Sequence, residues 1–266
     1  MSEISALWRP VPSGETAWLA DLCQEDSYTG YLAPGRPDAA WVLHAMYEYE
    51  QGPGTVSRHQ AHQAGLADGS IEPTVVAGID IDATPGLVTT GGGLGRAEHP
   101  GAGWRRLRWA ELARRVGEPV VAEGLLPSYR SAPDGRTADR SWPTGIEPPT
   151  EGSLDRETWN RLITILLAYA PAGANTRCLA HFSPLTMGAL FVDRGHVLTG
   201  GLGDALALYD LDEPDFSPAN LWPQDRSWIV CTDYDLWGTK VVGPTELIDA
   251  LVGDTELEAV RLPWAG

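Results

Sequence analysis

Apolar side chains recur with the period of an α-helix over residues 153–171. Four large side chains are spaced so that they share one helix face: Trp159, Leu162, Ile163 and Leu166. Ser153 stands where an N-cap is favoured, and acidic residues follow in the first turn, where the helix dipole stabilises them. A proline closes the segment, so the pattern predicts one helix that buries its apolar face.

Other segments alternate between apolar and polar positions or form short apolar runs, which is typical of β-strands. Strands are predicted at residues 37–50, 73–81, 105–109, 177–183, 189–200, 205–210, 227–234, 239–243 and 258–264. Further helices are predicted at residues 14–25, 56–69, 110–117 and 244–253. Strands and helices mix without a regular βαβ rhythm, so the sequence predicts an α+β fold with mixed, mainly antiparallel sheets and a few packed helices.

The residue composition of the chain changes between residues 127 and 152. Prolines are interleaved there with glycine, serine and aspartate, and no periodicity remains. A structureless segment of this length is uncommon inside a compact domain. The sequence therefore predicts an N-terminal α+β lobe at 1–126, a Pro/Gly-rich linker or long ordered loop at 127–152, and a C-terminal α+β lobe at 153–266.

Charge narrows the range of partners. The 266 residues include 36 acidic and 19 basic side chains, which gives a formal net charge of -17 at pH 7. This balance argues against nucleic acid and anionic membranes as partners and favours a basic protein. All the basic residues except Lys240 are arginines, a bias that we attribute to the codon usage of a GC-rich genome.

No targeting or membrane-spanning segment is predicted. The longest apolar run is far shorter than the roughly 18 residues that a membrane-spanning helix needs, and the first fifteen residues lack the pattern of a secretory signal. Cys23, Cys178 and Cys231 are odd in number and form no C-x-x-C pair, which predicts small buried hydrophobes in a reducing compartment. We therefore expect a cytoplasmic protein.

The segment DRSWIVCTDYDLWGTKVVGP, residues 225–244, concentrates polar and aromatic side chains. On a strand, Asp233 and Asp235 point to the same side, and such a pair suits a hard cation or acid–base chemistry. The alternative, which we favour, is a structural hairpin whose aspartates bond turn amides. Asp225, Asp233 and Asp235, with Trp237 as an aromatic anchor, are then candidates for a recognition surface.

A second pair of aspartates, Asp80 and Asp82, also closes a short apolar run. If the two pairs met between the lobes, they would line a carboxylate cleft. Arg105 or Arg106 would bind an anionic substrate there. This arrangement defines the alternative function, a small-molecule hydrolase or transferase.

Catalytic and cofactor motifs are missing from the sequence. Neither a G-x-S-x-G nucleophile motif nor a phosphate-binding glycine motif is present, and the glycines of TTGGGLG do not lead into a helix. His59 and His62 fall on one face of a predicted helix, but no third ligand can be identified. The sequence thus predicts no metal and no cofactor, and favours a protein that is not an enzyme.

The C-terminal part resembles a family of uncharacterised acidic proteins from GC-rich soil bacteria. The resemblance rests on DRSW, TDYD, TKVVG and EAVRL within residues 220–264, and on SLDRETWNRLITIL and TRCLAHFSPLTMG earlier in the chain. Such proteins are similar in look to the immunity proteins that neutralise polymorphic toxins. The resemblance implies a non-enzymatic, cytoplasmic protein that binds a basic toxin domain through its acidic residues.

Overall fold

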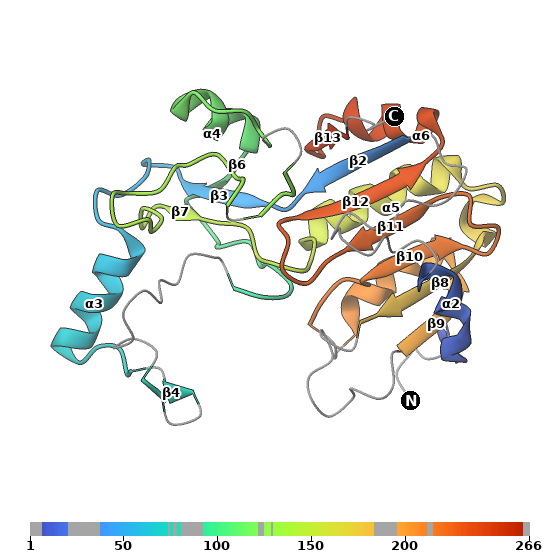
Figure 1. Cartoon of the computed structure of the whole chain (residues 1–266), viewed down its shortest axis with the longest axis horizontal. Helices are drawn as coiled ribbons and strands as arrows, with labels where there is room; N and C mark the ends of the chain where they lie inside the picture. Colours follow the sequence, from blue (N-terminus) through green and yellow to red (C-terminus); the bar gives the residue numbers. More distant parts are fainter. Residues whose placement is uncertain are drawn as a thin grey trace.

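The computed structural model describes residues 7–20, 38–73, 75–76, 79–80, 93–121, 125–128, 130–183, 196–211 and 215–262. Within them it shows an α+β fold with antiparallel sheets, as predicted (Figure 1). None of the described helices combines the length and the apolar character needed to cross a membrane.

The largest element is an eight-stranded antiparallel sheet. Its strands, in spatial order, are β1 (Arg9–Val11), β9 (His196–Gly201), β8 (Arg177–Phe182), β10 (Asn220–Pro223), β11 (Ile229–Thr232), β12 (Gly238–Gly243), β2 (Asp38–Leu43) and β13 (Ala259–Arg261). Successive side chains of a strand point to opposite faces, so the two faces of the sheet have separate cores.

Helices cover one face of this sheet. α5 (Arg156–Tyr169) passes behind β11 and β12 in Figure 1, and α6 (Thr245–Val252) and the 3-10 helix η5 (Leu202–Asp210) pack beside it. The apolar face predicted for α5 is buried against alternate sheet residues such as Val230 and Val241. The other face carries a smaller cluster, in which Ile229, Cys231 and Val242 lie near Trp222.

A second, three-stranded sheet continues from the first. β3 (Met46–Tyr49) follows β2 after a two-residue bend and pairs with β6 (Trp104–Leu107) and β7 (Ile146–Glu147). α4 (Trp109–Val116) packs on it, and the carboxylate of Glu258 accepts hydrogen bonds at 2.8 Å from the amides of Trp109 and Ala110. A residue near the C-terminus thus caps a helix of the N-terminal half.

Two helices and a hairpin lie at the edges of the molecule. α2 (Ala17–Ala20) lies near β8 and β9, whereas α3 (Arg58–Asp68) lies beyond the three-stranded sheet (Figure 1). β4 (Val75–Val76) and β5 (Ile79–Asp80) form a two-stranded hairpin near α3 and away from the eight-stranded sheet.

The predicted lobe boundary does not divide the fold. β1 and β2 come from the predicted N-terminal lobe, yet they lie in the same sheet as the C-terminal strands, because β2 pairs with β12 and β13. Trp142 and Ile146, from the predicted linker, are buried in the core of the three-stranded sheet. Local residue composition carries no information on such long-range strand pairing.

Several local predictions need correction. Residues 205–210 belong to the 3-10 helix η5, not to a strand, because their apolar side chains pack under α5. The N-cap of α5 is Asp155, not Ser153. Cys178 and Cys231 are buried, as predicted, whereas Cys23 lies outside the described residues.

Candidate functional site: an acid-lined pocket at the start of α5

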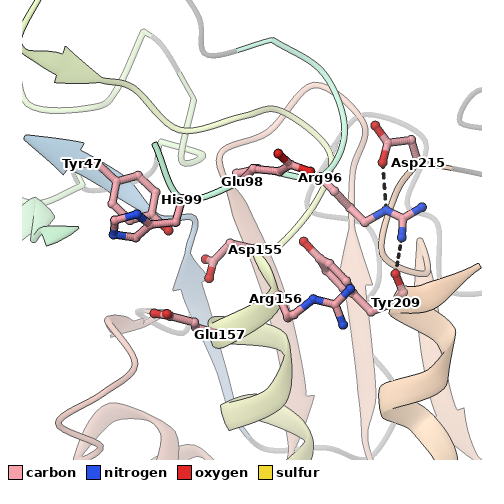
Figure 2. Close-up of a pocket in the computed structure, with 10 residues that line it drawn as sticks. Tyr47, Arg96, Glu98, His99, Asp155, Arg156, Glu157, Tyr209 and Asp215 are labelled. Atoms are coloured by element: carbon pink, nitrogen blue, oxygen red, sulfur yellow. Dashed lines mark hydrogen bonds and ion pairs between the residues drawn. The ribbon is translucent and has the colours of Figure 1, made fainter. Parts of the chain in front are cut away.

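A pocket of 460 Å³ opens at the N-terminus of α5, between the two sheets (Figure 2). We call it the acid pocket. It is lined by Tyr47, Arg96, Ala97, Glu98, His99, Asp155, Arg156, Glu157, Tyr209 and Asp215. These residues come from β3, the segment 96–99, the first turn of α5, η5 and the chain after it, so the pocket depends on the tertiary fold.

The cap of α5 fixes one wall of the acid pocket. The Asp155 carboxylate accepts hydrogen bonds from the Thr158 amide at 3.0 Å and from the Thr158 hydroxyl at 2.6 Å. Arg106 donates to the same hydroxyl at 2.9 Å. Asp155 is only 2% exposed, so these bonds hold a carboxylate in a fixed place where the helix dipole stabilises it.

The two arginines of the acid pocket are already neutralised. Arg96 donates to Asp215 at 2.9 Å and to the carbonyls of Tyr209 and Leu211. Arg156 makes an ion pair with Asp210 at 2.7 Å. Both guanidinium groups stack over the Tyr209 ring, with their central carbons 5.2 and 4.7 Å from its centroid.

Two tyrosines contribute the aromatic surface of the acid pocket. Burial raises the pKa of Tyr47 and of Tyr209 well above the usual range, and the charge of Asp155 acts in the same direction on both. The Tyr209 hydroxyl donates to the Leu154 carbonyl at 3.1 Å, and the Tyr47 ring packs edge-on against His99 with centroids 4.8 Å apart. Both phenols are therefore neutral at physiological pH.

Two further carboxylates complete the acid pocket. Glu98 and Glu157 are exposed, and neither makes an ion pair within the described residues. Figure 2 shows Asp155 and Glu157 on the same side of the pocket, facing the segment that carries Glu98. Because the arginines are paired, the carboxylates leave the acid pocket with an excess of negative charge, which favours a cation.

The predicted recognition residues do not form one surface. Asp225 lies in the turn before β11 and accepts a bond from the Ser227 amide at 2.9 Å, whereas Asp233 and Asp235 lie in the turn after β11. Trp237 is 0% exposed and packs against Trp109 and Trp142. The prediction that Trp237 anchors a partner is wrong, because its ring fills the core of the three-stranded sheet.

Asp233 and Asp235 do act on one another. Burial raises the pKa of Asp233 to about 6, and a hydrogen bond with Asp235 and the charge of that residue act in the same direction. Glu151 lies close by, and burial and the charge of Asp235 raise its pKa too. The turn after β11 therefore gathers like charges, which we call the acidic turn (Asp233–Asp235).

The alternative cleft does not form within the described residues. Asp80 belongs to the β4–β5 hairpin, which lies away from β11 and β12 in Figure 1, and Asp82 is outside the described residues. Arg105 is held by Glu48 and Glu111 in a network with Arg115, and Arg106 bonds Thr158. Both arginines thus have structural partners, and Arg106 supports the acid pocket.

Lys240 is a residue whose position the sequence interpretation missed. It is 3% exposed on β12, directly opposite Cys231 of β11 and Trp41 of β2. Asn220 and His181 continue the row, with His181 Nδ1 3.1 Å from Asn220 Oδ1. Opposed residues of antiparallel strands share a face, so these polar groups lie on the face opposite α5. The sequence does mark this position, because Lys240 is the single lysine in a chain with eighteen arginines.

No group of three or more histidine, cysteine or carboxylate side chains suited to a metal ion is found in the part of the chain that the structure describes. Comparison of the chain with models of protein families, with curated proteins and with solved structures found no match.

Proposed function

We propose that this chain is a non-enzymatic binding protein that takes a basic protein as its partner. In this proposal the acid pocket receives a positively charged side chain of the partner, an arginine or a lysine. A cytoplasmic immunity protein that neutralises a basic toxin domain is the role that fits best with the resemblance of the C-terminal part.

One observation carries the proposal: the acid pocket holds more carboxylates than its arginines neutralise. Arg96 and Arg156 are paired with Asp215 and Asp210, while Glu98 and Glu157 are without ion pairs among the described residues. A guanidinium or ammonium group that enters would replace water with charge-assisted hydrogen bonds, which are about twice as strong as neutral ones.

The size of the pocket and the charge of the whole chain support the same partner. A volume of 460 Å³ lies within the range of about 300–1,000 Å³ typical of ligand pockets. The net charge of -17 would steer a basic protein toward the chain from a distance, and the acid pocket would then fix the position of one side chain.

The first test compares three peptides that differ at one position. Blocked pentapeptides with arginine, lysine or citrulline at the centre are titrated into the protein by calorimetry at low and physiological salt. We expect the charged peptides to bind at least about tenfold more tightly than the citrulline peptide, which has the shape of arginine without its charge. Equal affinities for all three would contradict the proposal.

Matched variants place the binding on the structure. Glu98→Gln with Glu157→Gln removes two charges from the acid pocket, and Glu246→Gln with Asp225→Asn removes two exposed charges elsewhere. We expect the first pair to weaken binding of the arginine peptide about tenfold and the second pair by less than about twofold. An equal loss in both would show that only diffuse surface charge is involved.

A further inference from the structure

A second pocket, of 370 Å³, lies at the β1 edge of the eight-stranded sheet, where β1, β9 and β8 meet. We call it the arginine pocket. It is lined by Leu7, Arg9, Asn175, Arg177, Thr199, Gly200 and Gly201, and no acidic side chain is among these residues. In a chain of net charge -17, such a pocket is a local exception.

Strand register brings the two arginines together around one threonine. Arg9 of β1 lies directly opposite Thr199 of β9, and Arg177 of β8 lies opposite Gly201, two residues further along β9. Residues two apart on a strand, and residues directly opposed on neighbouring strands, share a face. Arg9, Thr199 and Arg177 therefore project from the same face of the sheet.

Hydrogen bonds set the orientation of this group. The Thr199 hydroxyl donates to the Cys178 carbonyl at 3.0 Å, which leaves its oxygen to accept from Arg177 Nε at 3.1 Å. Thr199 is 7% exposed, so the arginine is held on a buried support. The bond uses only one edge of the guanidinium group and leaves its two terminal nitrogens to bind a ligand.

The arginines of the arginine pocket differ from most others in the chain. In the described residues nine arginines make ion pairs with aspartate or glutamate. Neither Arg9 nor Arg177 makes an ion pair there, although the chain has 36 acidic residues and only 19 basic ones. Among the described residues no carboxylate thus forms an ion pair with either guanidinium group, although the Asp204 carboxylate lies near Gly201, 3.4 Å from where an added Cβ would stand.

Gly200 lets β1 pack closely on β9 at the face of the sheet opposite the arginine side chains, where Trp8 is buried. A Cβ atom at Gly200 would lie 2.6 Å from a ring carbon of Trp8 and 2.8 Å from the Leu7 carbonyl, so only glycine allows β1 and Trp8 to pack this closely. Trp8 is buried and its ring nitrogen donates to the Asp204 carbonyl at 2.9 Å. This packing fixes β1, and with it Arg9, against β9.

We propose that the arginine pocket binds a phosphate monoester, the dianionic phosphoryl group of a small organic ligand. Two guanidinium groups match the two charges and the several acceptor oxygens of such a group, and arginine binds phosphate oxygens in pairs. The Asn175 side chain adds an amide donor, and Leu7 offers apolar surface to the organic part. This site lies apart from the acid pocket and selects the opposite charge, so it does not depend on the function proposed above.

The test uses phenyl phosphate, phenyl sulfate and inorganic phosphate as probes, with binding measured by calorimetry at pH 7.5 and pH 5. The second pKa of a phosphate monoester lies near 6, so phenyl phosphate is a dianion at pH 7.5 and a monoanion at pH 5, whereas phenyl sulfate is a monoanion at both. We expect phenyl phosphate to bind at least about tenfold more tightly than phenyl sulfate at pH 7.5, and this difference to shrink at pH 5.

Variants decide whether the arginine pocket is responsible. Arg177→Gln and Arg9→Gln should each weaken binding of phenyl phosphate about tenfold, and Arg177→Lys should recover only part of it because a lysine cannot form the paired bonds. Arg114→Gln, at an exposed position of α4, is the matched control and should change affinity less than about twofold. These exposed substitutions leave the core intact, which circular dichroism and thermal unfolding would verify.

Two results would overturn the inference. One is the lack of saturable binding of both phosphate probes at millimolar concentration. The other is an equal loss of affinity in Arg177→Gln and Arg114→Gln. Tight binding of inorganic phosphate with no gain from the phenyl group would keep the anion site but limit its ligand to the phosphoryl group itself.

Discussion

The acid pocket and the arginine pocket each contain two arginines but differ in the carboxylates that accompany them. In the acid pocket Arg96 and Arg156 are paired with carboxylates and stacked on Tyr209, and unpaired carboxylates remain. Among the described residues that line the arginine pocket none is acidic, and Arg9 and Arg177 are exposed and make no ion pair there. The two pockets therefore favour ligands of opposite charge.

This difference shows that net charge is a poor guide to what a site binds. At physiological ionic strength charges are screened over about 8 Å, so a ligand in a pocket responds mainly to the groups that line it. The charge of -17 affects the approach of a partner, but the local balance decides which group enters. Substitutions that act on one pocket and spare the other are the direct way to test this comparison.

The largest effect is expected from Gly200→Ala. The added Cβ would lie 2.6 Å from the Trp8 ring, so β1 must shift or the ring must move. Overpacking of this kind typically costs about 1–3 kcal/mol, and we expect the free energy of unfolding to fall by about 2 kcal/mol. Urea denaturation measures this loss, and calorimetry should show that phenyl phosphate binding is lost while the arginine peptide still binds.

Gly14→Ala is the control for this substitution, because a Cβ at Gly14 meets nothing within 4 Å. We expect it to leave both the stability and the two binding activities close to those of the original protein. If Gly200→Ala weakened both pockets equally, the two would be coupled through the sheet and the comparison would not hold.

The next effect concerns the wall of the acid pocket. Asp155→Ala removes the N-cap of α5 and its two bonds to Thr158, and loss of an N-cap costs about 0.5–2 kcal/mol. We expect a loss near the upper end, about 1.5 kcal/mol, because Asp155 is buried. The measurement is again urea denaturation, followed by titration of the arginine peptide.

Asp155→Asn separates the structural role from the charge. An asparagine keeps an acceptor for the Thr158 amide, so most of the stability should return, whereas the negative charge does not. Cation binding by Asp155→Asn should therefore stay weak although the fold is restored. Full recovery of binding in this variant would mean that the charge of Asp155 plays no part in the acid pocket.

The local sequence pattern predicted helices and strands better than it predicted the pockets. The helical period and the strand runs placed α5, β11 and β12 correctly, because burial of one face imposes a local pattern. Residues 205–210 show the limit: short apolar runs pack equally well in a strand or in a 3-10 helix, and η5 is formed through contacts with α5. The period of apolar residues alone does not distinguish a short strand from a short 3-10 helix.

The pockets could not be predicted for a different reason. Arg9 and Thr199 are 190 positions apart in the sequence and meet only because β1 pairs with β9. Tyr47 and Asp155 are 108 positions apart and share the acid pocket only because the fold brings β3 to the start of α5. Prediction instead selected Asp225, Asp233 and Asp235 because they are close in sequence, yet β11 separates the first from the other two. Nearness in sequence was a poor substitute for strand pairing.

A smaller effect is expected at the acidic turn, where like charges lie together and, among the described residues, no arginine is ion-paired with Asp233 or Asp235. The pKa of Asp233 is raised to about 6, above its value of about 3.9 in an unfolded chain. The stability that its protonated form contributes is thus fully present below about pH 4 and is lost as the pH rises through about 6. At neutral pH the two aspartates repel one another.

Asp235→Asn removes this repulsion. We expect the free energy of unfolding to rise by about 1 kcal/mol at pH 7.5 and to change little at pH 4, where Asp233 already holds its proton. Urea denaturation at the two pH values measures the difference. Asp225→Asn, at the other end of β11, is the control and should show no pH-dependent gain; an equal gain there would point to a general effect of net charge.

The smallest effect concerns Lys240, which lies on the same face of the sheet as the arginine pocket but is buried where Arg9 and Arg177 are exposed. Burial lowers the pKa of Lys240, and the charge of Cys231 opposes that shift. Between the folded and unfolded pKa values the unfolded chain binds more protons, so this group makes the fold more stable as the pH rises. Because the chain has one lysine, the Nζ signal in NMR can be followed without ambiguity; its midpoint should lie below about 10.4 in the folded protein and return to that value in urea. Lys240→Arg should lose this pH-dependent gain in stability, since a guanidinium keeps its proton at any accessible pH. A midpoint of about 10.4 for Lys240 in the folded protein would contradict the prediction, because it would show that the ammonium group is fully solvated.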